Sequence, residues 1–558
     1  MNAIFLMVIG LSAFVAGYFL YSRFLAEKIF KLDPEFVTPA HEFEDGVDYV
    51  PTRPIVLWGH HFAAVAGAAP IVGPAIAVIW GWLPAFLWVT FGTVFFAGVH
   101  DYGALWASVR NKGQSVGAMT ADIVGERARN IFMIVIFLLL LMVNSVFAII
   151  IAGEHIAVPS SVIPTWVVIA VAMGIGWGVY KKGMSLLWVT IIGVTVLYGA
   201  IWVGSVYPLS LPETVFGLGA PAQWVIILFT YAGIASVLPV WLLLQPRDYI
   251  NGIQLFIGLA ILYTAVVIAN PTIVAPAINP NVPEGTPPLV PLLFVTIACG
   301  AISGFHGLVA SGTTSKQLDK EPHSRQVGYL GSVGEGTLAI AAIIACTAGF
   351  ASLEEWEGRY TSFTAGGLDV FVQGGAHILE TALSLSPAVG ETLLAVMAIL
   401  FAATTMDAGV RLQRYIIQEI GNNHNIQALT GRTVSTLVAV GACLLLAFGA
   451  GGAEPGSGGL IIWPLFGTSN QLLAGLTLMV ISVFLIKLGR PAKATMIPLI
   501  FLMLMTLPAL VIQLGTFWDQ RNYLLIVMDL VVLGASIFVT LEAYRALRAA
   551  KREAAGGV

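Results

Sequence analysis

The chain has 558 residues, of which 58% are hydrophobic and only 10% are Asp, Glu, Lys or Arg. Soluble globular proteins carry about 25% charged residues, so this composition excludes a soluble enzyme or a secreted domain and indicates a membrane protein with many spans. With a net charge of −4 and no basic stripe in the sequence, nucleic acid is not an expected partner. The expected partners are the lipid bilayer and a small-molecule substrate.

Continuous apolar runs, rather than the alternating ten-residue segments of a β-barrel, predict membrane-spanning helices. Fifteen such spans follow one another at 3–22, 61–80, 84–108, 130–153, 164–180, 184–206, 221–245, 251–273, 290–312, 334–352, 388–408, 432–451, 460–486, 494–515 and 520–544. They are numbered 1 to 15 below. The predicted fold class is an all-α polytopic membrane protein.

The distribution of basic residues predicts the topology. Span 1 has no basic residue before it and is followed by Arg23, Lys28 and Lys31, which favours an external N-terminus. With fifteen spans, 24 of the 26 Lys and Arg residues then lie in the cytoplasmic segments or at their edges, and only Arg359 and Arg521 lie outside. This split follows the positive-inside rule and predicts a cytoplasmic C-terminus.

Two spans contain residues that interrupt helices. Span 2 has Gly67, Pro70, Gly73 and Pro74 near its centre, and proline removes an amide donor and clashes with the preceding turn. Span 7 has Gly233 and Pro239. Unwound segments at the membrane midplane offer free backbone groups to substrates, so both spans are predicted to be non-helical there and to cross at a substrate site.

Spans 2 and 7 are five apart and therefore cross the membrane in opposite directions, which is typical of an inverted repeat. The predicted organisation is one transporter domain, 1–558, with the following parts: an extra span and loop at 1–58, a first repeat at 59–206, a second repeat at 221–408 and additional helices at 432–545. A 5+5 core of this kind resembles the LeuT-like fold of the amino acid–polyamine–organocation transporters. The external segment 353–387 could form a re-entrant or surface helix that acts as an outer lid, or a partly ordered loop.

Ionisable residues inside the spans converge in depth toward the cytoplasmic half, and such residues usually face a cavity or a partner. His100 and Asp101 lie in span 3, His306 lies in span 9, and His60 and His61 begin span 2. The other polar candidates near this depth are Ser311, Thr313, Thr314, Glu335 and Asp407.

Several readings of this group stay open. A carboxylate with nearby imidazoles can carry a proton. Alternatively, the hydroxyls of span 9, the eighth helix of the predicted core, and the carbonyls of unwound span 2 could bind sodium. A metal site on His60, His61, His100, Asp101 and His306 is a further alternative, although adjacent His60 and His61 are not a usual ligand spacing. Inter-helix hydrogen bonding alone is the structural alternative.

Four successive polar residues, Thr468 to Gln471, lie in the middle of span 13 and imply a break or a cavity. Because span 13 lies outside the predicted repeats, we expect these side chains to bond the helix to the core. Asp529 in span 15 is a lone carboxylate without an assigned partner.

No GxxxxGK[ST] loop, GxSxG elbow or HExxH helix occurs in the sequence, so the protein is not expected to be an enzyme. No cofactor is expected beyond the coupling ion, H⁺ or Na⁺.

Five long blocks carry a family resemblance: GHHFAAVAGAAPIVGP (59–74), AGVHDYGALW (97–106), GFHGLVASGTTSKQ (304–317), TTMDAGVRLQRY (404–415) and WPLFGTSNQLLAGL (463–476). In this order they resemble the carbon starvation protein A (CstA) family. The resemblance implies a bacterial or archaeal inner-membrane transporter induced on nutrient depletion, with peptides or pyruvate as substrate and protons driving pyruvate uptake. Carried over by block, it points to His60, His61, Gly67, Pro70, Gly73, His100, Asp101, His306, Thr313, Thr314, Asp407 and Asn470.

The sequence thus predicts a secondary active importer of pyruvate or short peptides, coupled to protons. A sodium-coupled symporter and a sensor or channel-like protein remain as alternatives. The residues predicted to bind substrate are His60, His61, Gly67, Pro70, Gly73, Gly233 and Ser236. Those predicted to couple the ion are His100, Asp101, His306, Thr313, Thr314 and Asp407.

Overall fold

The computed structural model describes residues 1–46, 48–239, 241–423 and 425–556, and it is a bundle of helices. In this part of the chain, thirteen helices are long and apolar enough to cross a membrane. A fourteenth span consists of two short helices that bend by 52° at a break. Two further short helices, α14 and α15, occupy the place of predicted span 9. The all-α fold class is confirmed.

The elements of the first half are α1 Ala3–Ala16, η1 Gly17–Tyr21, α2 Ser22–Phe24, η2 Leu25–Phe30, α3 Pro39–Glu42, α4 Pro54–Val65, α5 Ala69–Ala77, η3 Val78–Trp80, α6 Trp82–Gly92, η4 Thr93–Ala97, α7 Gly98–Arg110, α8 Val116–Ile123, α9 Glu126–Ala157, η5 Pro159–Ser161, α10 Val162–Lys182, α11 Leu186–Val206, β1 Thr214–Val215, β2 Leu218–Gly219, α12 Ala220–Val237 and α13 Leu244–Ala269. The short strands β1 and β2 pair as an antiparallel hairpin.

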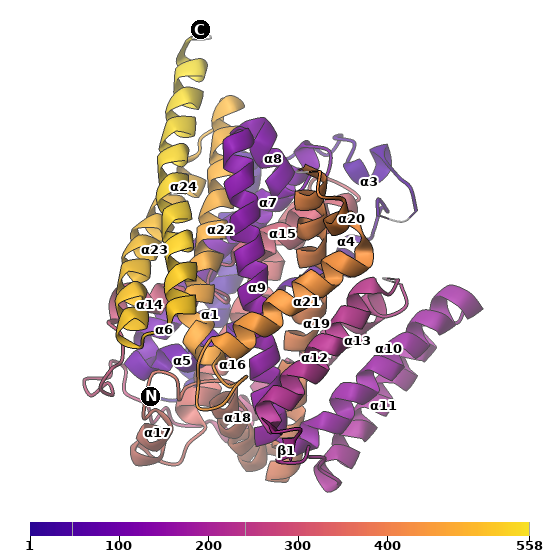
Figure 1. The fold of residues 1–558 in the computed structure, drawn as a ribbon, viewed down its shortest axis with the longest axis vertical. Helices are drawn as coiled ribbons and strands as arrows, with labels where there is room; N and C mark the ends of the chain where they lie inside the picture. The colour runs from indigo at the N-terminus through magenta and orange to yellow at the C-terminus, as the bar shows by residue number, and fades with distance from the viewer. Residues whose placement is uncertain (47, 240, 424, 557–558) are drawn as a thin grey trace.

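The elements of the second half are α14 Leu289–Thr296, α15 Gly304–Gly312, η6 Thr314–Lys316, η7 Arg325–Tyr329, α16 Leu330–Ala348, α17 Leu353–Arg359, α18 Leu368–Leu383, α19 Pro387–Asn423, α20 Gln427–Thr430, α21 Arg432–Gly449, α22 Gly459–Lys487, α23 Lys493–Asp519 and α24 Tyr523–Gly556. The N- and C-termini lie at opposite ends of the bundle (Figure 1). We call these the N-terminal end and the C-terminal end.

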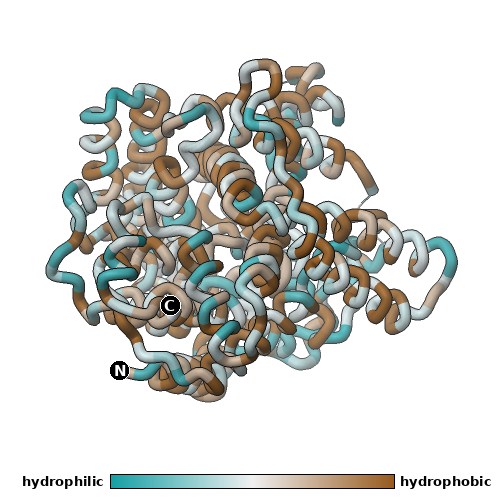
Figure 2. The backbone as a smooth tube through the Cα atoms, turned by 90° about the horizontal axis from the view of Figure 1, so that it is seen from below, coloured by the Kyte–Doolittle hydropathy of each residue, from teal (hydrophilic) through white to brown (hydrophobic). Residues whose placement is uncertain are grey.

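Large apolar side chains cover the outside of the bundle. Phe19, Trp188 and Leu445 are 62%, 63% and 75% exposed. Viewed along the bundle, brown and pale helices form much of the rim, and the teal hydrophilic residues gather in connecting loops (Figure 2). Exposed apolar surface on this scale marks contact with lipid or with another protein.

The predicted break in span 2 is confirmed. Helix α4 ends at Val65, α5 begins at Ala69, and residues 66–68 between them are not helical. The break precedes the prolines, because Pro70 lies in the first turn of α5, where a missing amide costs nothing, and Pro74 lies inside α5. The two arms, 54–65 and 69–80, have equal length of about 18 Å at 1.5 Å per residue, so the break lies at the middle of the span.

The predicted break in span 7 is wrong. Helix α12 is continuous through Gly233 and ends at Val237. The next residue, Leu238, is extended because it precedes Pro239, and a residue before proline disfavours the α conformation. Pro239 therefore ends this span instead of interrupting its middle. Residue 240 lies outside the described part of the chain.

The second interruption lies in predicted span 9. Helix α14 ends at Thr296, α15 begins at Gly304, and residues 297–303 between them form no helix. Gly300 has a positive φ of +92°, which favours glycine. The two interruptions are thus seven predicted spans apart instead of five, and the division into repeats at 59–206 and 221–408 loses the argument on which it was based.

The segment 353–387, which the sequence predicts to be external, contains the two helices α17 and α18, and α18 packs on the bundle. Gly349, just after α16, and Gly374 of α18 approach so closely that a Cβ on Gly349 would lie 2.2 Å from the Gly374 carbonyl oxygen. The apolar face of α18 is buried, including Leu368, Phe371 and Leu379. This segment is therefore a packed surface helix at the N-terminal end.

At the C-terminal end, the segment that leads into α4 is bonded to the segment that follows α15. The amides of Val50 and Thr52 donate to the carbonyls of Lys316 and Gln317 at 3.3 and 3.0 Å, and the Thr38 hydroxyl donates to the Asp319 carbonyl at 3.1 Å. His41 Nε2 lies 2.9 Å from Asp319 Oδ1. Partial burial lowers the pKa of nearby His323, although the Asp319 carboxylate opposes that effect.

Candidate functional site

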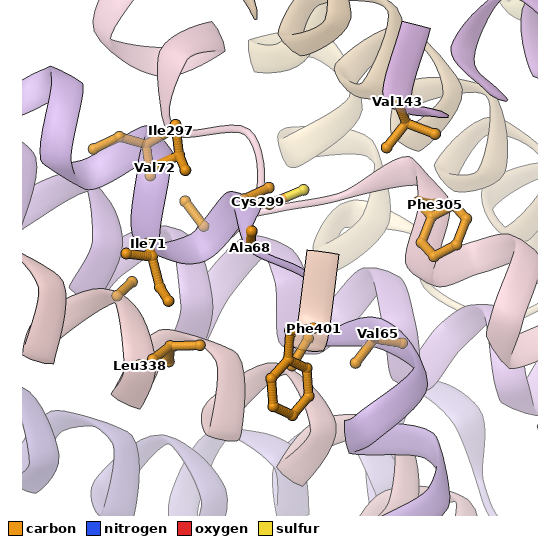
Figure 3. Close-up of a cluster of buried hydrophobic side chains, with 14 of the residues drawn as sticks. Val65, Ala68, Ile71, Val72, Val143, Ile297, Cys299, Phe305, Leu338 and Phe401 are labelled. Carbon is orange, nitrogen blue, oxygen red and sulfur yellow. The ribbon is translucent and has the colours of Figure 1, made fainter. Parts of the chain in front are cut away.

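The two interruptions lie side by side in the centre of the bundle. Figure 3 shows the segment from Ile297 through Cys299 to Phe305 passing beside Ala68. A Cβ on Gly73 would lie 2.7 Å from the carbonyl oxygen of Thr296, so only glycine permits this approach of α5 to the end of α14. Between the interruptions lies a small apolar cavity lined by Val65, Gly67, Ala69, Leu139, Val143, Phe147, Cys299, Phe305, Thr405 and Phe466.

Side chains from α6, η4 and α22 bond the backbone of the second interruption. Four carbonyls at or near it accept hydrogen bonds: Phe294 from Gln471 Nε2 at 2.5 Å, Thr296 from Trp463 Nε1 at 3.1 Å, Ile297 from Trp88 Nε1 at 3.0 Å and Gly300 from Thr93 Oγ1 at 2.9 Å. The Phe305 amide donates to Asn470 Oδ1 at 3.0 Å. The polar run in continuous helix α22 thus bonds to the core, as predicted, and the interruption is in its neighbour.

The first interruption has a different environment. The N-terminus of α5 has no side-chain cap, and the Gly67 amide bonds locally to the Val65 carbonyl at 2.9 Å. Thr405 of α19 lies beside it, since its hydroxyl oxygen would be 3.0 Å from a Cβ on Gly67. The backbone of the first interruption therefore borders the cavity and has fewer hydrogen bonds to side chains than the backbone of the second interruption.

Asp101 of α7 forms the centre of a buried polar cluster. His100 Nδ1 lies 2.7 Å from Asp101 Oδ1, His306 Nδ1 lies 2.8 Å from Asp101 Oδ2, and the Ser332 hydroxyl donates to Oδ2 at 2.7 Å. The side chains of Asp101, His100 and His306 are fully buried. The convergence in depth expected from the sequence thus corresponds to direct contact.

His306 also contacts a second carboxylate. Its Nε2 atom lies 3.3 Å from Glu335 Oε2 of α16, and the side chain of Glu335 is 1% exposed. His306 is the third residue of α15, so the imidazole that joins Asp101 and Glu335 is within one turn of the second interruption. The residue before it, Phe305, lines the cavity.

His61 and His60 differ in their surroundings. His61 is fully buried, and its Nδ1 lies 2.9 Å from the Thr314 hydroxyl. Its ring packs on α16, where a Cβ on Gly331 would lie 2.6 Å from the ring. His60 is only partly buried. Thr313 is exposed, and its hydroxyl donates to the Val309 carbonyl of its own helix at 3.0 Å.

Asp407 belongs to a separate cluster, away from the other predicted coupling residues. Its Oδ2 atom forms an ion pair with Arg247 Nη1 of α13 and accepts a hydrogen bond from the Tyr231 hydroxyl at 2.8 Å. Sequence reasoning missed Arg247, which it counted as a cytoplasmic loop charge, whereas the structure buries it to 1% exposure in the first turns of α13. The sequence did contain a signal for buried ions in this region, because Asp407, Arg411 and Arg414 are spaced by four and three residues and therefore lie on one face of a helix.

The remaining predicted substrate residues divide into two groups. Pro70 is buried in the first turn of α5, against Gly300 of the second interruption. Gly233 faces Val440 of α21, and the Ser236 hydroxyl donates to the Gly233 carbonyl at 3.0 Å. Gly233 and Ser236 were predicted from the supposed break in span 7, and the structure places them in α12, outside the two interruptions and the lining of the cavity.

Within the described ranges, no three His, Cys, Asp or Glu side chains are grouped so that they could hold a metal ion together. The metal alternative therefore finds no ligand set there. The sodium alternative changes as well, because span 9 is the second interrupted helix and Thr314 bonds to His61. The hydroxyl that borders the first interruption belongs to Thr405.

Two interrupted helices that meet beside a cavity and a buried ionisable cluster, inside a bundle of spanning helices, define a polytopic membrane transporter. The family model for carbon starvation protein CstA matches residues 2–353 and 351–509. The chain belongs to this family.

Its relatives include a peptide transporter CstA of Campylobacter jejuni, 36% identical over 91% of this chain and 79% of the relative. The pyruvate/proton symporter BtsT of Escherichia coli is 33% identical over 92% of this chain and 82% of its own. A peptide transporter CstA of Bacillus subtilis is 32% identical over 94% and 91%. The relatives are thus named as transporters.

Among solved structures, MhsT in complex with L-phenylalanine aligns with 88% of this chain and 99% of its own, with 13% identity and a TM-score of 0.48. A manganese transporter of Eremococcus coleocola aligns with 87% of this chain and 95% of its own, with 14% identity and a TM-score of 0.38.

Proposed function

We propose that this protein imports pyruvate or short peptides across the cytoplasmic membrane of a bacterium or archaeon, driven by a proton gradient. Membership in the CstA family and the names of the relatives, which include peptide transporters and a pyruvate/proton symporter, support this proposal. In this proposal the N-terminal end of the bundle is external and the C-terminal end is cytoplasmic, as the distribution of basic residues favours.

The contact of His306 with two carboxylates is the observation that carries proton coupling. An ionised Asp101 can only accept, so the 2.8 Å contact requires a proton on His306 Nδ1. His306 Nε2 and the Glu335 carboxylate, 3.3 Å apart, have no hydrogen-bond partner in the described part of the chain. One further proton, on the imidazole or on the carboxyl, would relieve the repulsion between their lone pairs. Asp101 and Ser332 position the ring, and the exchangeable proton is shared by His306 and Glu335.

Substrate binding would be linked to this proton through the ends of the half-helices. The N-termini of α5 and α15 both lie at the interruptions, and helix N-termini attract negative charge. Asn470 already bonds the Phe305 amide at the start of α15, whereas α5 begins without a side-chain cap. We therefore infer that a substrate carboxylate binds at the start of α5, beside Gly67.

We also infer a revised division of the transporter core. If the two interrupted spans begin the two repeats, the first repeat comprises α4 to α13 and the second comprises α14 to α22. The pair α10 and α11 would then be an insertion in the first repeat, which fits their position at the edge of the bundle (Figure 1). The helices α1, α23 and α24 would surround this core.

Sodium coupling remains a second candidate because of Thr405. Its hydroxyl borders the first interruption, and the neighbouring Thr404 accepts a hydrogen bond from Asn251 Nδ2 at 2.7 Å. Hydroxyl and carbonyl oxygens suit a hard cation. Under this candidate, accumulation follows a sodium gradient and is lost in Thr405→Val.

Uptake of labelled pyruvate and dipeptides into proteoliposomes, under separately imposed proton and sodium gradients, tests the proposal. We expect accumulation with a proton gradient alone, and we expect Glu335→Gln to abolish it while substrate exchange without a gradient continues. Asp529→Asn is the matched control, because Asp529 is an equally buried carboxyl on α24, outside the inferred core. Proton-driven accumulation by a well-folded Glu335→Gln variant would contradict the coupling role, and absence of uptake of either substrate would contradict the proposed substrates.

A further inference from the structure

A long apolar groove runs between α23 and α24, away from the two interruptions. It has a volume of about 940 Å³, and its lining comes from residues 496–508 of α23, including Ile500 and Leu504, and from residues 540–552 of α24, including Thr540, Ala543, Arg548 and Arg552. This volume lies at the upper end of the range of protein ligand sites. Its apolar residues extend along both helices, and two arginines lie near the C-terminal end of the bundle.

The sequence of the two helices explains the groove. Pro498 and Pro508 lie inside α23, and proline within a helix removes a backbone bond and bends the axis. On the facing side of α24, Thr540 and Ala543 are too small to fill the space. Leu504 and Ile500 are consequently 61% and 53% exposed, although they lie beside a neighbouring helix.

The dimensions of the groove match one leaflet of a bilayer. The lining residues span 496–508 on α23 and 540–552 on α24, which is about 18 Å at 1.5 Å per residue. Half of a bilayer hydrocarbon core is about 15 Å thick. An acyl chain that extends from the headgroup level to the midplane therefore fits the length of the groove.

The two arginines at the end of the groove favour a lipid with an anionic headgroup. Arg548 and Arg552 are four residues apart and lie on one face of α24 at the end of the groove, and both are exposed. Guanidinium groups bind phosphate oxygens in a bidentate manner. Arg545 belongs to the same helix but does not line the groove, and it pairs with Glu542 at 3.4 Å.

We propose that this groove binds an anionic phospholipid, with its acyl chain against α23 and its phosphate on Arg548 and Arg552. The site is independent of the substrate and of the coupling ion. It assigns a function to the two C-terminal helices, which the proposed transport path does not use. Bound lipid would fill the space between α23 and α24 and hold the two helices at a fixed separation.

Native mass spectrometry of the full-length protein tests this proposal, with phosphatidylglycerol and phosphatidylcholine of identical acyl chains as probes. We expect selective retention of phosphatidylglycerol. The double variant Arg548→Gln/Arg552→Gln should weaken that retention about twenty-fivefold, because each basic side chain near an anionic headgroup contributes about fivefold. Arg545→Gln, the matched control on the same helix, should change it by less than twofold.

Ala543→Phe fills the groove while both arginines stay in place, and it should reduce retention of both lipids in a monodisperse protein. Equal retention of the two lipids by the wild type would overturn the proposal, as would equal losses in Arg545→Gln and the double variant. A dimer that Ala543→Phe dissociates, with no lipid retained, would assign the groove to a second copy of the chain instead.

Discussion

The two interrupted helices differ in how their backbone groups are bonded. The second interruption, 297–303, and the helix ends beside it are held by the side chains of Trp88, Thr93, Trp463 and Asn470, which come from three other elements. The first interruption, 66–68, is short, uncapped and adjacent to the cavity. In a membrane every unbonded backbone group is costly, so one interruption is stabilised as part of the scaffold and the other keeps groups that a ligand can bond. An interrupted helix alone therefore does not identify a binding site.

The largest expected effect on stability comes from Gly467 of α22. A Cβ there would lie 2.0 Å from the carbonyl oxygen of Val295, which is backbone and cannot rotate away. Gly467→Ala should therefore push α22 off α14 and destabilise the protein by about 3 kcal/mol or more. Thermal denaturation in detergent measures this effect. Gly515→Ala on α23, with no atom within 4 Å of its Cβ, is the control. An unchanged melting temperature in Gly467→Ala would show that the second interruption is not rigidly held.

Asn470→Ala should have the next largest effect. It removes the acceptor for the Phe305 amide and the 3.1 Å bond from Asn470 Nδ2 to the Ser303 hydroxyl. Side-chain hydrogen bonds between membrane helices contribute about 0.6 kcal/mol on average and up to about 1.7, so we expect a loss of about 1–2 kcal/mol. Thr477→Ala, whose hydroxyl donates to the Leu473 carbonyl of its own helix, provides a comparison on α22. Equal melting temperatures for the two variants would contradict the assignment of Asn470 as a cap.

Gly67→Ala should reduce substrate uptake strongly while it changes the stability of the protein only slightly. The added Cβ would meet the side chains of Thr405 and Phe147 at 3.0 and 3.2 Å, and side chains can move. We expect a loss of stability of less than about 1 kcal/mol but a large loss of substrate uptake, because the methyl group fills the space beside the first interruption. Uptake of labelled pyruvate and dipeptides, measured together with the melting temperature of the same variant, tests this prediction. Normal uptake by Gly67→Ala would remove the first interruption from the substrate site.

The smallest effect is expected for Thr405→Val. If protons alone drive transport, this variant keeps proton-driven accumulation and loses less than about 1 kcal/mol of stability, because the isosteric side chain preserves packing beside Gly67. Parallel uptake measurements with proton and sodium gradients are the readout. Loss of accumulation in Thr405→Val together with dependence on sodium would move the coupling site from His306 and Glu335 to the first interruption.

The sequence predicted the first interruption but misplaced the second, for a physical reason. Gly67 and Pro70 are local signals, and they lie within a few residues of the bend. Residues 297–303 contain no proline, and the carbonyls of Ile297 and Gly300 are bonded by Trp88 and Thr93, which are distant in the chain. Such bonds have no local pattern. The four polar residues in span 13 did indicate an interruption, but the interrupted helix is the neighbouring span 9 and not span 13 itself.

The equal depth of Asp101 and His306 in their predicted spans indicated a contact that the structure shows, while their roles in coupling stay a prediction. Spanning helices are straight enough that residues at equal distance from the membrane surface can meet, which is how Asp101 and His306 were paired. Depth says nothing about which helices are neighbours, so Asp407 was grouped with them although α13 and α12 surround it. Arg247 was missed because apolar windows place the start of a span too late when a buried ion pair lies in its first turns.

The bonds between the segments before α4 and after α15 have a mechanical consequence. Val50 and Thr52 bond the backbone of one segment to Lys316 and Gln317 of the other, so α4, the first arm of one interrupted helix, and α15, the second arm of the other, are joined at the C-terminal end of the bundle. The first interruption, 66–68, is the freer hinge of the two, because it has no side-chain cap, whereas the second interruption is hydrogen-bonded to α6 and α22. If α4 tilts during transport, we expect these bonds to move α15 with it, so that His306 on α15 changes its position relative to Glu335.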